Sequence, residues 1–216
     1  MSSTFYSHSR LSCYEKCPFQ YKLKYVDRVR APLGTSIEAF VGSMVHDALE
    51  WLYRLVRDGR VATREELAGK YQELWDAKWK DDIRVIKYEL AVEHYRSNGQ
   101  KWVEQYWDRY QPFDQGITID LECKVFIDLP GGGKVMGYID RLEKAGNNHF
   151  VIHDYKTSGR LPTSHETEND RQLALYMLGI QQRYPDLKKI DLVWHFVRFD
   201  EDVWSQRTDE QLQKMA

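Results

Sequence analysis

The first half of the chain carries the hydrophobic spacing of amphipathic helices. Apolar and aromatic residues recur every three to four positions. This spacing predicts three helices, over about residues 36–56, 63–80 and 83–110. We expect the third helix to be interrupted near Ser97-Asn98-Gly99. A shorter helical segment over residues 9–25 should break or restart at Pro18, because proline is tolerated in a first helical turn.

After Pro112 the spacing changes from helical to alternating. The segment from Ile117 to Leu129 alternates and predicts a strand. We expect one face of this strand to hold Ile117, Ile119, Leu121, Cys123, Val125 and Ile127. Turns at 131–133 and 147–148 lead to strands over 134–142 and 150–156. The remaining expected elements are a helix over about 167–183, a strand over 191–199 and a helix that starts at 208–210.

This order of elements predicts an α/β (α+β) fold. A helix between the third and fourth strands is typical of a right-handed crossover in a mixed sheet. We expect a central mixed sheet of about four to five strands flanked by helices. The chain is long enough for one substantial core, so we expect a single domain over residues 1–216. Its helical part would cover about 1–112 and its sheet-centred part about 113–216.

Composition narrows the class of protein only modestly. Hydrophobic residues make up 42% of the chain and charged residues 30%, as in ordinary globular proteins. No stretch reaches the length of a membrane span and no apolar signal region is present, so we expect a cytoplasmic protein without a membrane partner. The formal net charge of -2 does not by itself indicate a nucleic-acid partner. Three cysteines neither favour a disulfide framework nor complete a four-cysteine metal site.

Two of the predicted strands carry acidic and basic residues at a suggestive spacing. Asp140 and Asp154 lie on neighbouring strands, and Lys156 follows Asp154 by two positions. Residues two apart on a strand project from the same sheet face. Carboxylates gathered at one sheet edge are costly to bury, unless a divalent cation lies between them and the lysine faces a negatively charged substrate. The pattern therefore indicates metal-dependent chemistry on a phosphate ester.

Other candidate residues lie on the predicted helices and on the preceding strand. His46 lies on the long helix, and Gln172 and Tyr176 are four residues apart, hence on one helix face. Taken singly, each has an ordinary structural explanation as a packed or solvated side chain. Their order, spacing and element types together favour a functional role. Glu122 could supply a third carboxylate, or it could be an outward-facing strand residue.

These segments resemble the PD-(D/E)XK nuclease superfamily, specifically its RecB-like branch, which includes the CRISPR-associated iron–sulfur exonucleases. The matching segments are Cys17-Pro18-Phe19-Gln20-Tyr21, Gly42-Ser43-Met44-Val45-His46, Gly137-Tyr138-Ile139-Asp140-Arg141, Asp154-Tyr155-Lys156-Thr157 and Gln172-Leu173-Ala174-Leu175-Tyr176. The Asp and Asp-x-Lys pair is a weak motif alone, whereas five segments in this order are specific. The resemblance implies a restriction-endonuclease-like core.

The resemblance also implies a role for each residue. Mg²⁺ or Mn²⁺ would be bound by His46, Asp140, Asp154 and the backbone carbonyl of Tyr155, and an imidazole ligand makes Mn²⁺ more plausible. Lys156 would orient the attacking water or neutralise charge on the phosphate. The implied catalytic set is Asp140, Asp154, Lys156, Gln172 and Tyr176. The residues expected to contact DNA are Lys16, Lys22, Lys24 and Arg171.

The chain departs from this branch in its cysteines. Cys17 matches the first ligand of a [4Fe–4S] cluster, whose other three cysteines follow near the C-terminus in the branch. This chain reaches Ala216 without them. Either the cluster has been lost or the chain is truncated, and a predicted helix still running at Ala216 favours truncation. We expect no [4Fe–4S] cluster in these 216 residues.

Three functions are compatible with the sequence. The first is a metal-dependent DNA nuclease that acts on single strands or free ends in DNA repair, recombination or CRISPR-type processing. The second is a catalytically silent nuclease fold that binds DNA or protein. The third is a metal-dependent phosphodiesterase that acts on small molecules. The complete set of expected catalytic residues favours the first.

Overall fold

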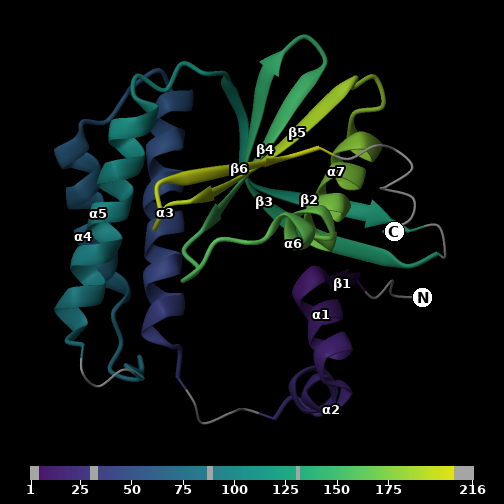
Figure 1. Cartoon of the computed structure of the whole chain (residues 1–216), viewed down its shortest axis with the longest axis horizontal. Helices are drawn as coiled ribbons and strands as arrows, with labels where there is room; N and C mark the ends of the chain where they lie inside the picture. The colour runs from purple at the N-terminus through teal and green to yellow at the C-terminus, as the bar shows by residue number, and fades with distance from the viewer. Residues whose placement is uncertain (1–4, 30–33, 87–89, 130–131, 207–216) are drawn as a thin grey trace.

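A six-stranded mixed sheet forms the centre of the molecule (Figure 1). The computed structural model describes residues 5–29, 34–86, 90–129 and 132–206. The strands are β1 (Phe5–Ser7), β2 (Ile117–Asp128), β3 (Lys134–Gly146), β4 (His149–Lys156), β5 (Lys189–Phe196) and β6 (Glu201–Ser205). They follow the order β1-β3-β4-β5-β6, and β2 also pairs with β3. The β1–β3 and β4–β5 pairs are parallel and the others antiparallel, which confirms the predicted α/β class.

Helices cover both faces of the sheet. The helices are α1 (His8–Lys16), α2 (Pro18–Tyr21), α3 (Ile37–Arg57), α4 (Arg64–Lys78), α5 (Val92–Tyr110), α6 (Ser164–Glu168) and α7 (Arg171–Arg183), with a π-helical turn over Lys22–Val26. In Figure 1, α3, α4 and α5 stand side by side on one side of the sheet, and α7 lies against the other. Within the described residues, no helix is both long and apolar enough to cross a membrane.

Each side of the sheet has its own hydrophobic core. The core on the helical side joins α3, α4 and α5 to a few sheet residues, with Leu49, Tyr71 and Val103 fully buried. The core on the other side joins α7 to the sheet, with Ile152 and Ile180 fully buried. Burial of these faces supplies the main driving force for placing both helical layers on the sheet. The sheet therefore holds α3 on the side opposite α7.

Two predicted helices differ from those in the structure. The predicted third helix was wrong at its start and in its interruption, because α5 begins at Val92 and runs through Gly99 without a break. A Cβ at Gly99 would lie 2.0 Å from the Tyr71 hydroxyl, so this glycine permits close packing of α5 on α4. The predicted helix over 167–183 is divided in two. Asp170 is the N-cap of α7, because its side chain accepts a hydrogen bond from the Leu173 amide.

The strands also depart from the predicted limits. The predicted sheet lacked β1 and β6, and β5 ends at Phe196 rather than at residue 199. The start of β6 is a chain reversal at Asp200, which has a positive φ of 54°. The expected helix at 208–210 lies outside the described residues.

The single apolar face predicted for β2 was wrong. Leu121 packs in the core beside α3, whereas Cys123, Val125 and Ile127 pack in the core beside α7. The alternation breaks at Glu122, which has a left-handed φ of 48°. The sheet register also shifts between Thr118 and Asp120. At Glu122, the buried side chains of β2 therefore switch from the sheet face beside α3 to the face beside α7. The same backbone conformation turns the Glu122 side chain toward α3.

Candidate metal centre and catalytic site

The sheet opens between β3 and β4 at the position of the two predicted aspartates. The last residue pair of the β3–β4 ladder is Arg141 with His153, so Asp140 and Asp154 lie one residue beyond it. The Tyr155 amide donates a 2.7 Å hydrogen bond to Asp140 Oδ2, and the Tyr155 carbonyl lies 2.8 Å from His46 Nε2. Side chains thus satisfy the backbone groups that a continuing ladder would have paired. This opening brings α3 and both strands to one point.

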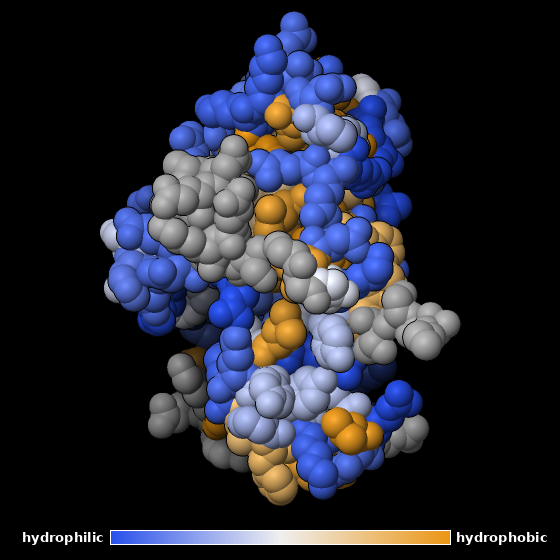
Figure 2. Space-filling view, turned by 90° about the vertical axis from the view of Figure 1, so that its right-hand side faces the viewer, coloured by the Kyte–Doolittle hydropathy of each residue, from blue (hydrophilic) through white to orange (hydrophobic). Residues whose placement is uncertain are grey.

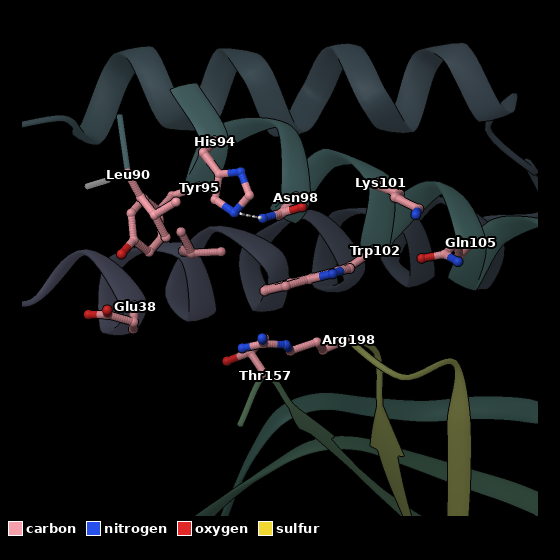
Figure 3. Close-up of a pocket in the computed structure, with 11 residues that line it drawn as sticks. Glu38, Leu90, His94, Tyr95, Asn98, Lys101, Trp102, Gln105, Thr157 and Arg198 are labelled. Atoms are coloured by element: carbon pink, nitrogen blue, oxygen red, sulfur yellow. Dashed lines mark hydrogen bonds between the residues drawn. The ribbon is translucent and has the colours of Figure 1, made fainter. Parts of the chain in front are cut away.

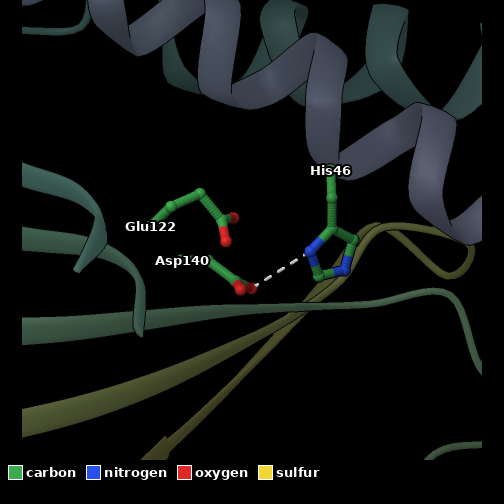
Figure 4. Close-up of side chains that lie close together, drawn as sticks. All are labelled: His46, Glu122 and Asp140. Carbon is green, nitrogen blue, oxygen red and sulfur yellow. Dashed lines mark ion pairs between the residues drawn. The ribbon is translucent and has the colours of Figure 1, made fainter. Parts of the chain in front are cut away.

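Three potential ligand side chains converge at this opening (Figure 4). His46 projects from α3 toward Glu122 of β2 and Asp140 of β3. One ligand atom from each residue lies within 4.8 Å of the others. His46 Nδ1 is 3.4 Å from Asp140 Oδ2. A histidine nitrogen and two carboxylates at this separation are a suitable donor set for a divalent ion.

The electrostatics of this group show an excess of negative charge. Burial raises the pKa of Glu122 to about 7, and the carboxylates of Asp140 and Glu50 add to the rise. Burial opposes protonation of His46, but its hydrogen bond to Asp140 and the charges of Asp140 and Asp154 raise its pKa to about 9. Such shifts report that a positive charge is favoured here. A bound cation would relieve the same repulsion.

Asp154 and Lys156 form a second part of the site, beside the three converging side chains. Their side chains share a face of β4, as predicted, with Lys156 Nζ 2.6 Å from Asp154 Oδ2. That oxygen is buried, and the Lys156 ammonium is its ion-pair partner. Burial raises the pKa of Asp154 to about 6; Lys156 opposes the rise and Asp140 adds to it. Burial opposes the charge on Lys156, but the carboxylates of Asp154 and Asp140 raise its pKa, which keeps it a cation.

Gln172 and Tyr176 approach the site from α7. Gln172 Nε2 donates a 2.7 Å hydrogen bond to the Tyr176 hydroxyl. Burial raises the pKa of Tyr176; the Gln172 hydrogen bond opposes the rise, and the charges of Asp154 and Asp140 add to it. A Cβ at Gly137 would lie 2.5 Å from Tyr176 Cε1, so only glycine leaves room for this ring against β3. The phenol stays neutral and lies close enough to sense both aspartates.

The residues present fit a hard divalent cation. Carboxylate and carbonyl oxygens with one imidazole nitrogen suit Mg²⁺ or Mn²⁺, and the nitrogen favours Mn²⁺. The buried Asp154 carboxylate, which Lys156 contacts through one oxygen, offers a further ligand group. The candidate ligands are His46, Glu122, Asp140, Asp154 and the Tyr155 carbonyl.

Two cavities flank the end of β4. The first, of about 330 Å³, lies between α3, α5 and the ends of β4 and β5, and Figure 3 shows Trp102, Lys101 and Arg198 among its lining residues. Thr157, the residue after Lys156, also lines it. The second cavity, of about 280 Å³, includes Lys156 itself. Both open beside the candidate site, and basic side chains line each of them.

The other predicted functional residues lie on the N-terminal helices and at the start of α7. Lys16, Lys22 and Lys24 are exposed on α1 and the π-helical turn. Arg171 is exposed and forms an ion pair with Glu15, and Lys22 lies 3.2 Å from Asp27. Burial lowers the pKa of His8, the charge of Asp170 opposes this and that of Lys156 adds to it, so the start of α1 lies near the site.

The cysteines are not part of the group of converging ligand atoms. Cys17 ends α1 and caps α2, with its sulfur accepting from the Gln20 amide. Cys13 and Cys17 are half-buried free thiols, and Cys123 is a buried one. The Cys17 side chain therefore has a local structural role in the described part of the chain.

The site thus combines carboxylates and a lysine from neighbouring strands of a mixed sheet with a histidine from a covering helix. The family model of the PD-(D/E)XK nuclease superfamily matches residues 6–216. The chain therefore belongs to this superfamily, whose members are generally metal-dependent nucleases. This confirms the resemblance at the level of the superfamily.

Glu122 is the site residue that the sequence left most open. The hairpin between β2 and β3 pairs Asp128 with Lys134, and the same register places Glu122 opposite Asp140. That pairing follows from the short connection between Asp128 and Lys134, so counting back from this connection would have brought the two carboxylates together. The left-handed backbone at Glu122, which aims the side chain, had no signal in the sequence.

Proposed function

We propose that this chain is a metal-dependent deoxyribonuclease of the RecB-like branch, which hydrolyses phosphodiester bonds in single strands or at free ends. The observation that carries the proposal is the convergence of His46, Glu122 and Asp140 beside the Asp154–Lys156 pair. DNA repair, recombination or CRISPR-type processing are the pathways that need such an enzyme. The helical part and the sheet-centred part would act as one domain, since α3 and β3 both contribute to the site.

The proposed metal site would hold Mg²⁺ or Mn²⁺ between His46, Glu122, Asp140, Asp154 and the Tyr155 carbonyl. A divalent ion supplies positive charge against the scissile phosphate and favours ionisation of the attacking water. Burial and the neighbouring carboxylates raise the pKa of Glu122 and of Asp154; a bound cation would offset both effects, and both side chains would be fully ionised.

Lys156 would neutralise charge that develops on the phosphate. Its ammonium is held by Asp154 and lines the second cavity, so it reaches both the buried carboxylate and the space open to substrate. Preorganised cations of this kind stabilise a transition state without reorganisation. Tyr176, as a neutral phenol oriented by Gln172, would donate a hydrogen bond to the DNA backbone or position the aspartates.

Basic side chains around the site would hold the strand. Lys101 and Arg198 line the first cavity, and Arg160 lines the second. The exposed Lys16, Lys22, Lys24 and Arg171 would add phosphate contacts on the N-terminal side. Local patches of this kind can bind DNA even though the formal net charge is -2.

Cleavage of end-labelled single-stranded and duplex DNA tests this function. We expect cleavage with Mn²⁺ or Mg²⁺ and none in chelator. Lys156→Met should lower the rate about 10²–10³-fold, as for loss of one preorganised charge or donor. Lys189→Met is a matched control, because Lys189 pairs with Asp191 at the far end of β5. Full activity in folded Lys156→Met would contradict the site, and metal binding without cleavage of any nucleic acid would favour a silent module.

A further inference from the structure

An exposed group of aromatic side chains and one lysine lies on the β1–β2–β3 part of the sheet. We call Phe5, Lys124, Phe126 and Tyr138 the aromatic strip. Phe5, Phe126 and Tyr138 are 37%, 51% and 47% exposed. Figure 2, which views the molecule from the side of the β2–β3 hairpin end, shows hydrophobic side chains reaching the surface among hydrophilic ones. Large exposed aromatic groups on one sheet face are typical of an interaction site.

The strand register makes this strip continuous with the candidate metal centre. Lys124 pairs with Tyr138, and Phe126 pairs with Met136. The next position toward the site on the same face holds Glu122 opposite Asp140. Successive side chains on one face stand roughly 7 Å apart along a strand. The strip therefore starts at the Lys124–Tyr138 pair, the next pair on this face after Glu122 and Asp140. From there it runs along the hairpin, away from these carboxylates.

The contacts within the strip favour unpaired bases as its ligand. Lys124 Nζ lies 5.0 Å from the centre of the Phe126 ring and 6.0 Å from that of Tyr138. Among the described residues, no carboxylate forms an ion pair with Lys124. The Phe5 and Phe126 rings lie 5.2 Å apart. Exposed rings beside a free cation combine base stacking with phosphate attraction.

The strip is not the exposed edge of a core. Val125 and Ile127, which alternate with Lys124 and Phe126 along β2, are buried against α7. The sheet thus has its packed face on the other side at these positions. A partner protein would also fit exposed aromatic side chains, but it would not require continuity with a group of metal-ligating carboxylates.

We propose that the aromatic strip is a stacking platform for the bases of single-stranded DNA, which leads the strand to the metal centre. The proposal rests on the proposed nuclease function and specifies its substrate class. Bases in a duplex are stacked on each other and would not reach Phe126 and Tyr138. The platform would therefore select single strands over duplex.

Fluorescence anisotropy with the whole chain tests the platform. The probes are a labelled 20-mer of thymidine, an abasic strand of the same length and a duplex, all in Ca²⁺ without turnover. Because each stacked base contributes roughly a fivefold or larger factor to affinity, Phe126→Ala/Tyr138→Ala should weaken thymidine 20-mer binding roughly 30-fold or more. Abasic and duplex binding should change less than about twofold, since neither offers a free base.

Two variants control for unrelated effects. Trp204→Ala removes a 58% exposed ring on β6 and should leave binding unchanged. Phe126→Tyr keeps an aromatic ring at this position and should retain most of the wild-type affinity for the thymidine 20-mer. Equal losses for thymidine and abasic strands, or no loss at all, would overturn the platform. So would a self-association of the wild type that the double variant abolishes while DNA binding persists.

The same samples separate this inference from the proposed nuclease function. Binding that depends on Phe126 and Tyr138 without cleavage in Mn²⁺ would sustain the platform and refute the nuclease. Cleavage that proceeds with unchanged single-strand affinity in the double variant would sustain the nuclease and refute the platform.

Discussion

Consecutive residues of β3 and β4 build two polar clusters of opposite character. Asp140 and Asp154 belong to the open site, where carboxylates outnumber nearby cations. Arg141 and His153, one residue away on the same strands, belong to a buried network with balanced charge. Arg141 lies 2.5 Å from Glu143 and 2.8 Å from His153.

The buried network continues across the sheet to β5 and β6. His153 Nδ1 lies 2.8 Å from His195 Nε2, and His195 Nδ1 lies 2.8 Å from Asp202. Burial, together with the charges of Arg141 and His195, lowers the pKa of His153, so this imidazole is neutral. Each charge in the network has a partner within the protein. Unmatched charge, rather than polarity or burial, therefore distinguishes the candidate metal site from this network.

The largest effect on folding is expected from the network. Arg141→Met leaves Glu143 buried without its partner and removes a guanidinium that lies 3.9 Å from the centre of the Tyr53 ring. Unfolding free energy should fall by about 3–5 kcal/mol, measured by urea denaturation without metal. Arg160→Met removes an exposed ion pair with Glu166 and should cost far less than Arg141→Met. Equal losses in both variants would show that the buried network stabilises the fold no more than an exposed ion pair does.

A smaller effect with a defined pH dependence is expected at Asp202. Burial opposes its ionisation, but its hydrogen bond with His195 and the charge of His195 lower its pKa below the ordinary value. This stabilisation is present above about pH 4 and is lost as the pH falls through the lowered pKa. Asp202→Asn should therefore cost about 1–2 kcal/mol at pH 7, with the difference shrinking below about pH 4.

Denaturation curves of Asp202→Asn between pH 3 and 7 measure this difference. Asp114→Asn, which changes an exposed carboxylate, should match the wild type throughout. A constant deficit at every pH would mean that Asp202 acts through packing rather than through its charge.

The smallest effect on stability is expected at the candidate metal site, where the substitution should stabilise the protein instead of destabilising it. Glu122→Gln removes one of the carboxylates that repel each other. The unfolding free energy of the metal-free protein should therefore rise by up to about 1 kcal/mol at pH 8, a modest gain because solvent screens the exposed Glu122 side chain. The pKa of Glu122, about 7, lies above the ordinary value, so the cost of ionising it is absent at pH 4 and grows toward pH 7. The gain should vanish at pH 4. A loss of stability at pH 8 would show that Glu122 has a protein partner rather than an unmatched charge.

Residue spacing was sufficient to predict the parts of the site that lie on regular elements. Asp154 and Lys156 share a face because strand geometry requires it, and Gln172 contacts Tyr176 because helix geometry does. The apolar stripe over about residues 36–56 predicted α3, which spans Ile37–Arg57, to within a residue at each end. Local periodicity was enough in these cases.

The rest depended on irregular backbone and on contacts between distant segments. Glu122 reaches the site only because its left-handed φ breaks the alternation of β2. The opening between β3 and β4, where Asp140 and His46 replace ladder hydrogen bonds of Tyr155, is a tertiary feature. The continuity of α5 through Gly99 likewise depends on packing against Tyr71. Neither propensity nor spacing reports such features.

Thermal unfolding with and without Mn²⁺ tests the central claim most directly, namely that His46, Glu122 and Asp140 gather to bind a divalent ion. An ion at about a hundred times its dissociation constant should raise the melting temperature of the wild type by on the order of 5–10 °C. Asp128→Asn, at the far end of β2, should keep this shift, and Glu122→Gln/Asp140→Asn should lose it. The same Mn²⁺-dependent shift in the folded double variant would contradict the account.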